Sequence, residues 1–151
     1  MGAVTYPNPE VERVIREQFV PVQFNVVEQP EVMDQFNGHW TPTLIVQDAE
    51  GSEHRRTQGY LDPPRFLAEM ALARLQDAIN ESRFDAVPAL AREAQERSKG
   101  DPTREAEAIY WSSVAEYKAS HDGNKLLAGW NRLLDEFPQS EWAKRAEFIR
   151  A

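Results

Sequence analysis

The sequence predicts two fold classes in series, an α/β unit followed by an all-α region. Up to about residue 60, helix-periodic segments alternate with short apolar segments that are typical of strands. From residue 66 to residue 149 the apolar pattern is helical throughout. A hydrophobic fraction of 41% in 151 residues is enough for a packed interior. We therefore expect two domains, at residues 1–80 and 81–151.

The first two expected elements are a helix and a strand. Residues 9–18 carry apolar side chains at helical spacing, and Asn8 followed by Pro9 is a typical helix start. Residues 19–26 then alternate apolar and polar side chains, with Val20, Val22, Phe24 and Val26 on one face. This alternation predicts a strand that is covered on one side.

A short helix and a β-hairpin should follow. Residues 30–36 predict the helix, and Asn37-Gly38 should end it because glycine adopts a left-handed cap cheaply. Residues 43–47 are almost continuously apolar, which predicts a buried strand. Residues 48–51 give a turn signal, and the polar residues 52–57 read as the second arm of the hairpin, an edge strand.

The rest of the chain should be helical. A long helix is expected to start at Asp62-Pro63, by the same logic of a cap followed by proline. Asp85 is the expected cap of the next helix, and Asp101-Pro102 opens another. The helical stripes of apolar residues lie within residues 66–79, 84–94, 106–117, 126–134 and 142–149.

Composition excludes several classes of function. A net charge of −8 argues against nucleic acid or an anionic membrane as the main partner, because both need concentrated Lys and Arg. No apolar run has the length of a membrane span, and no signal sequence follows Met1, so we expect a cytoplasmic protein. The chain has no cysteine, and the thiolate is the nucleophile of disulfide exchange. As written, it is therefore not an enzyme of thiol–disulfide chemistry.

An ordered set of segments in the first half resembles the thioredoxin superfamily. The set comprises residues 3–11, 19–22 and 40–43, then Gly51, Gly59-Tyr60 and Phe66-Leu67. It is similar to bacterial domains in which a Cys-x-x-Cys helix leads into the first of these segments. In that pattern the first strand, first helix, second strand and the Cys-x-x-Cys would all lie before Met1. The resemblance thus implies a truncated thioredoxin-like sheet with flanking helices, without the redox dithiol.

The resemblance also implies a candidate site at Trp40, Thr41 and Pro42. In the family the proline follows a cis peptide bond, and the loop before it lies against an extended substrate peptide. We expect these three residues to bind a peptide. The alternative is that Trp40 fills the core and Pro42 is a conformational relic.

The family pattern further implies an empty position in the sheet, since the missing second strand would lie between residues 19–26 and 43–47. Unpaired backbone groups of this kind cannot be buried cheaply. We expect a second copy of the chain to fill the gap as a homodimer, with insertion of residues 2–6 as one route.

The helices of the second half resemble tetratricopeptide hairpins. The sequence Ala-Glu-Ala-Ile at 106–109 recurs 40 residues later as Ala-Glu-Phe-Ile, and residues 134–143 resemble the junction between two such repeats. The spacing exceeds the standard repeat of that family, so the array should be irregular. Among its aromatic residues, Tyr110, Trp111, Tyr117 and Trp130 are expected to pack between helices rather than to line a peptide groove.

Other side chains give no sign of a catalytic or metal site. His39, His54 and His121 sit in separate segments without ligand spacing, so no metal and no cofactor is expected. Asp34, Asp48 and Glu50 are not accompanied by a nucleophile or an oxyanion feature.

Two functions from different classes remain, and a purely structural dimer without a ligand is a third option. The first is a non-redox module that binds a protein or peptide, without nucleic acid or membrane as partner. The second is a fragment of a thiol–disulfide oxidoreductase whose Cys-x-x-Cys is encoded upstream of the present start. The DNA preceding Met1 distinguishes them.

Overall fold

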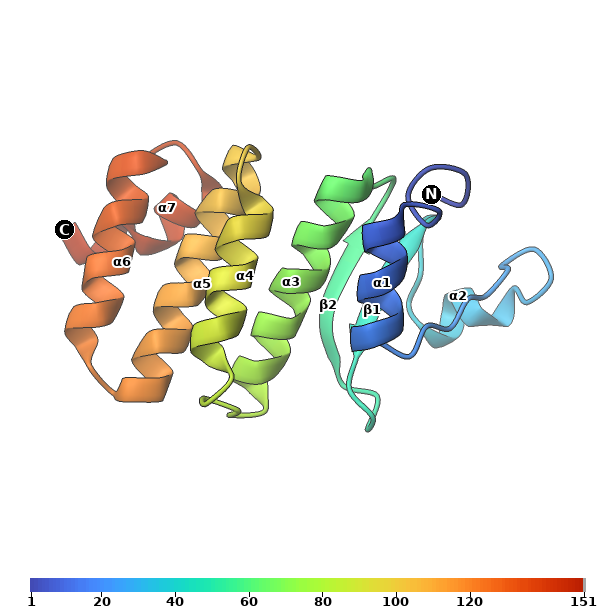
Figure 1. The fold of residues 1–151 in the computed structure, drawn as a ribbon, viewed down its shortest axis with the longest axis horizontal. Coiled ribbons are helices and arrows are strands. Elements are labelled where there is room, and N and C mark those ends of the chain that lie inside the picture. Colours follow the sequence, from blue (N-terminus) through green and yellow to red (C-terminus); the bar gives the residue numbers. More distant parts are fainter. Residues whose placement is uncertain (151) are drawn as a thin grey trace. The chain divides into compact units, whose positions relative to one another are not determined.

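The computed structural model describes residues 1–150, which form two compact units (Figure 1). The first unit is Met1–Leu67, and the second begins at Ala68, within helix α3 (Pro63–Asn80). The first unit contains α1 (Pro9–Gln18), α2 (Glu31–Gln35), β1 (Thr43–Gln47) and β2 (Glu53–Gln58). The predicted change from an α/β to an all-helical region is thus present, although the sheet formed by the described residues has only two strands.

Helix α1 begins where the sequence predicts, because the Asn8 side chain accepts hydrogen bonds from Glu10 N and Val11 N and Pro9 occupies the first turn. Its buried side chains are Val11 and Val14. Before α1, Thr5 is fully buried and donates its hydroxyl to Leu61 O at 2.5 Å.

The next residue along, Tyr6, packs edge-on against Phe66 at 5.9 Å. Burial raises the pKa of the Tyr6 phenol. The structure therefore packs Thr5 and Tyr6 against their own chain. Insertion of residues 2–6 into a second copy stays a prediction.

The strand predicted for residues 19–26 is not formed, and that prediction is wrong. Figure 1 draws this segment as a plain trace between α1 and α2. Among residues 1–150, nothing hydrogen-bonds to the backbone of Val20, Pro21, Val22, Gln23 or Phe24. Alternation of apolar residues supplies a face for a strand, but a strand also needs a neighbour for its backbone groups.

Helix α2 and the hairpin follow the expected order with local differences. Asn37, rather than Gly38, takes the left-handed conformation after α2, with a φ of 49°. Strands β1 and β2 pair antiparallel with a bulge between Val46 and Gln47. The strand predicted for residues 43–47 is formed, but residues 43–46 are half-buried rather than buried and Gln47 is exposed.

The second unit consists of the remainder of α3 with α4 (Val87–Ser98), α5 (Pro102–Ser120), α6 (Gly123–Glu136), α7 (Glu141–Ala146) and the 3-10 helix η1 (Glu147–Arg150). Helix α5 packs on both α4 and α6, as Figure 1 shows. The caps at Asp101 and Ser140 are formed by their side chains. Asp85 is not the cap of α4, because Ala86 takes that position without a side-chain bond.

Two apolar clusters hold the second unit together. One joins α3, α4 and α5 and includes Leu72, Leu75, Val87 and Ala115. The other joins α5, α6 and α7 around Trp130 and Leu133. Trp130 stacks on Tyr110 at 5.2 Å, as expected for aromatic residues between helices, whereas Tyr117 is 41% exposed and outside this cluster.

Helices α5 and α6 approach closely at Gly129, and this contact gives a test of the packing. A Cβ at Gly129 would overlap Ser113 Oγ and lie 2.8 Å from Ser113 Cβ. Gly129→Ala should gain about 1 kcal/mol of helix propensity but lose roughly 1–3 kcal/mol to overpacking, for a net loss of about 1 kcal/mol. Urea unfolding measures the change.

Gly123→Ala is the matched control, because nothing lies within 4 Å of the added Cβ at the start of α6. Its free energy of unfolding should stay within about 0.5 kcal/mol of wild type or rise. A Gly129→Ala variant more stable than wild type would contradict the packing described here.

Candidate functional site

The turn that leads into β1 carries the three residues singled out in the sequence. The Thr41–Pro42 peptide bond is cis, the geometry that the thioredoxin resemblance implies. The Thr43 hydroxyl donates to Trp40 O at 2.6 Å, and Gly59 N donates to Pro42 O at 2.8 Å. Gly59 has a φ of 95°, which favours glycine at this position. These bonds fix the turn to the beginning of β1 and the end of β2.

One edge of β1 is open. Because Gly59 N bonds to Pro42 O and hydrogen-bonded pairs alternate along an antiparallel ladder, Leu44 and Val46 direct their N–H and C=O groups toward β2. Thr43 and Ile45 direct theirs to the opposite side. No residue among 1–150 pairs with these backbone groups of Thr43 and Ile45. The arrangement can accept an additional strand.

The side chains beside this open edge are accessible. Trp40 is 65% exposed, and Thr41 and Pro42 are exposed as well. Trp40 is therefore not core filling. The turn offers a large aromatic surface directly before a row of unpaired backbone groups.

A second accessible surface is the segment 19–27, which follows α1. The exposed fractions are 93% for Val20, 71% for Val22, 42% for Phe24 and 86% for Val27. The Phe24 ring packs on the Phe36 ring, with the two centroids 5.9 Å apart. A run of exposed apolar side chains of this kind marks an interaction surface more often than an isolated exposed valine does.

Arg56 on β2 is a positioning residue that the sequence analysis missed. It pairs with Glu53, and its guanidinium donates to Phe36 O at 2.8 Å, which attaches the end of α2 to the hairpin. The Glu53 hydrogen bond raises the pKa of Arg56 above its ordinary value. Arg56 is the cross-strand partner of Ile45, but sequence alone gives no signal for its contact with a residue 20 positions away.

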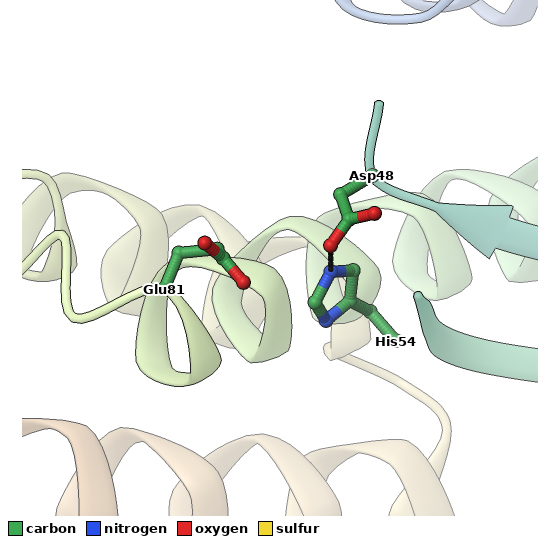
Figure 2. Close-up of side chains that lie close together, drawn as sticks. All are labelled: Asp48, His54 and Glu81. Atoms are coloured by element: carbon green, nitrogen blue, oxygen red, sulfur yellow. Dashed lines mark hydrogen bonds and ion pairs between the residues drawn. The ribbon is translucent and has the colours of Figure 1, made fainter. Parts of the chain in front are cut away.

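Asp48 organises the turn at the other end of the hairpin. Its Oδ1 accepts from Ser52 N at 2.8 Å and from Glu50 N at 3.0 Å, and its Oδ2 lies 3.1 Å from His54 Nε2 (Figure 2). The bond from Ser52 N, followed by that from His54, lowers the pKa of the Asp48 carboxyl. An ionised carboxylate only accepts, so His54 Nε2 carries the proton. Glu81, also labelled in Figure 2, belongs to the second unit.

Asp48→Asn tests this turn through pH. A carboxyl whose pKa is lower in the folded state stabilises the fold at pH values above its unfolded pKa, and this contribution disappears as the pH falls through the folded value. Wild type should therefore lose stability between about pH 5 and pH 2, and the variant should lose less over that interval. Thermal melts of both proteins across the interval measure the difference. Identical pH profiles would show that Asp48 has no such role.

The sequence-predicted residues are brought together only in part. Trp40, Thr41 and Pro42 form one turn at the open edge, whereas Asp48 pairs with His54 at the opposite end of the hairpin and bonds to neither Asp34 nor Glu50's side chain. Within residues 1–150, no helix is long and apolar enough to cross a membrane.

Comparison with known families identifies one match. Residues 2–74 match a family model described as a thioredoxin-like domain. Comparison with curated proteins and with solved structures found no significant match.

Proposed function

Residues 2–74 match a thioredoxin-like domain and the chain has no cysteine, and on that premise we propose that the protein is a non-redox interaction module. Its ligand is an extended peptide segment of a partner protein. The segment adds to the open edge of β1 and packs against Trp40, Thr41 and Pro42. Binding of this type needs backbone hydrogen bonds and a side-chain anchor, and no nucleophile.

The open edge of β1 is the observation that carries this proposal. Thr43 and Ile45 present N–H and C=O groups at the spacing of a β ladder, and an added strand would satisfy them. Trp40, 65% exposed, stands directly before these residues. Tryptophan is enriched among the residues that dominate binding energy, because it buries a large area with few rotatable bonds.

Selection of peptides from a randomised display library on the full chain tests the proposal. We expect ligands with alternating apolar residues. Trp40→Ala should weaken a selected peptide about 30-fold, the effect of losing a principal anchor. Phe148→Ala, an equally exposed aromatic residue of the second unit, is the matched control and should leave the affinity unchanged.

A backbone control distinguishes strand addition from simple apolar adhesion. N-methylation of alternate peptide residues that face β1 removes ladder hydrogen bonds and should abolish binding, whereas methylation of the other set should not. The proposal fails if no selected peptide binds saturably, if Trp40→Ala binds as wild type, or if both methylated sets bind equally.

A second copy of the chain is the partner we propose for the segment 19–27. Val20 to Phe24 have no backbone partner within residues 1–150, and their apolar side chains are exposed. The same chain has an open strand edge at β1. Two copies related by a two-fold axis can satisfy both features at once, which is the closed arrangement most homo-oligomers adopt. The edge of β1 holds one added strand at a time, so the peptide and the second copy compete for it and the peptide binds the dissociated chain.

The helical region is, in this proposal, an irregular tetratricopeptide-like array that extends the interaction surface. One support is the antiparallel pair α5 and α6, whose close approach at Gly129 requires a small residue. The other is α7, which follows this pair and contains Ala146, the start of the segment that repeats the sequence at residues 106–109.

One observation favours the alternative, a fragment of a thiol–disulfide oxidoreductase. The exposed segment 19–27 and the open edge of β1 are the two strand positions that flank the family's second strand. An open reading frame encoding an upstream Cys-x-x-Cys would support this alternative. The chain of 151 residues itself should not reduce insulin disulfides, because it has no thiol.

A further inference from the structure

A groove of about 320 Å³, lined by both apolar and charged residues, lies in the second unit between α4, α5 and α6. Its lining comes from one face of each helix, since Ser112 and Glu116 are one turn apart on α5 and Lys125, Gly129 and Arg132 lie at helical spacing on α6. Ligand pockets range from about 300 to 1,000 Å³, so this volume suits a small molecule.

The charge of the groove differs from that of the chain. Lys125 and Arg132 line it together with one carboxylate, Glu116, so the lining is net positive in a chain whose net charge is −8. The two cations are two turns apart on α6, about 10 Å along the helix axis. This pair of positive groups favours an anion with two charged ends.

The two cationic side chains of the groove keep hydrogen-bond donors that are not bonded to other described residues. Lys125 Nζ has no hydrogen bond or ion pair among residues 1–150. Arg132 uses Nε for Glu136 at 2.9 Å and makes only a long contact, 3.4 Å, with Gln95. Both side chains therefore keep N–H groups that can be donated to a ligand.

Ser112 gives an independent indication of a ligand. It lines the groove at 2% exposure, and its Oγ has no hydrogen-bond partner among residues 1–150. The adjacent Ser113, by contrast, donates its hydroxyl to Ile109 O at 2.7 Å. A buried hydroxyl without a partner destabilises a fold unless a bound group satisfies it.

From these observations we propose that the groove binds a small dicarboxylate. One carboxylate lies at Arg132 and the other at Lys125, and the Ser112 hydroxyl donates to the ligand between them. Hydrogen bonds between ionised donors and acceptors are stronger than those between neutral groups, which matters in a site that can make only a few of them. Glu116 opposes the ligand's charge and limits its affinity. The proposal concerns the second unit and does not depend on peptide binding by the first.

Glutarate is the probe, titrated into the ¹⁵N-labelled full chain while amide resonances are followed by NMR. Saturable shifts centred on Ser112, Gly129 and Arg132 are expected, with a Kd of about 1 mM or tighter. Added salt should weaken binding. Butyrate, which has one carboxylate, and inorganic phosphate should each bind at least about tenfold more weakly, since one end of the site is then unpaired.

Four variants give effects of different sign. Arg132→Gln should weaken glutarate about tenfold, and Glu116→Gln should tighten it about threefold because a repelling charge is removed. Ser112→Ala should weaken binding about threefold yet keep or raise the Tm of the free protein, because the unpaired hydroxyl is gone. Lys144→Gln, a cation of α7 paired with Glu141, is the control and should change nothing.

Any one of three results would overturn the proposal. The first is the absence of saturable shifts up to roughly 20 mM glutarate, and the second is binding of butyrate or phosphate as tight as that of glutarate. The third is an unchanged affinity for glutarate in Arg132→Gln or in Ser112→Ala.

Discussion

Replacing Arg104 with methionine is expected to lower the free energy of unfolding by about 3–5 kcal/mol, the largest single-residue effect we foresee. Arg104 pairs with Glu69 at 2.8 Å, and the two side chains are only 17% and 5% exposed. A second bond joins Arg104 to Asp101 at 2.9 Å. Removing the guanidinium takes from the buried Glu69 carboxylate its partner at 2.8 Å, and losing the close partner of a buried charge costs far more than losing a surface pair.

Two further variants are compared with Arg104→Met. Arg13→Met removes an exposed pair with Glu17, and its effect should be within about 0.5 kcal/mol. Adding Glu69→Gln to Arg104→Met should recover part of the loss, because the buried group is then neutral. Urea unfolding of the four proteins measures these differences. Equal effects of Arg104→Met and Arg13→Met would show that the Glu69 pair is not buried in solution.

The double variant Val20→Lys with Val22→Lys is expected to dissociate the proposed homodimer and leave a folded monomer. Both side chains are exposed in the single chain, so lysine is tolerated there. In the dimer each valine would be buried, at about 1.5–3 kcal/mol for a full side chain. Losing both should raise the dimer Kd by about 100-fold or more.

Sedimentation equilibrium at several concentrations, together with circular dichroism, measures the assembly and the fold. Val4→Lys is the matched control, because Val4 is 57% exposed but lies outside the segment 19–27. It should remain dimeric. A wild-type chain that is monomeric at about 100 μM, well above the Kd of an ordinary stable dimer, would exclude the homodimer.

Local signals were sufficient for most helices. Helices α1 and α5 each begin where a capping side chain is followed by proline. The cap and the proline are adjacent in the sequence, so the sequence alone locates these two helix starts. The hairpin was likewise predictable from the turn residues 48–51. The cap of α4 was not, since Asp85 carries the right side chain but Ala86 lies at the position where helical geometry begins.

The failed strand at residues 19–26 has a different cause. Its alternating valines are a property of the sequence, whereas strand formation depends on a neighbour that local patterning does not report. The segment forms no helix or strand, and most of its side chains are exposed. The same property that misled the prediction makes this segment a candidate interaction surface.

The candidate site was accessible from sequence only through family resemblance. Trp40, Thr41 and Pro42 are recognisable because they are contiguous, and the resemblance supplies their role. The Arg56 contact with Phe36 O and the open backbone groups of Ile45 depend on how distant segments pair. The groove of the second unit could not be predicted from the sequence for the same reason, because its lining comes from three helices.

Amide hydrogen exchange at β1 tests most directly the claim that this edge accepts a strand. In the free, dilute protein the Thr43 and Ile45 amides should exchange quickly, while Leu44 and Val46, which face β2, exchange slowly. Addition of a selected peptide should protect Thr43 and Ile45 and leave Leu44 and Val46 unchanged. If a peptide binds saturably while Thr43 and Ile45 exchange as fast as before, the ligand does not pair with β1 and the central claim is wrong.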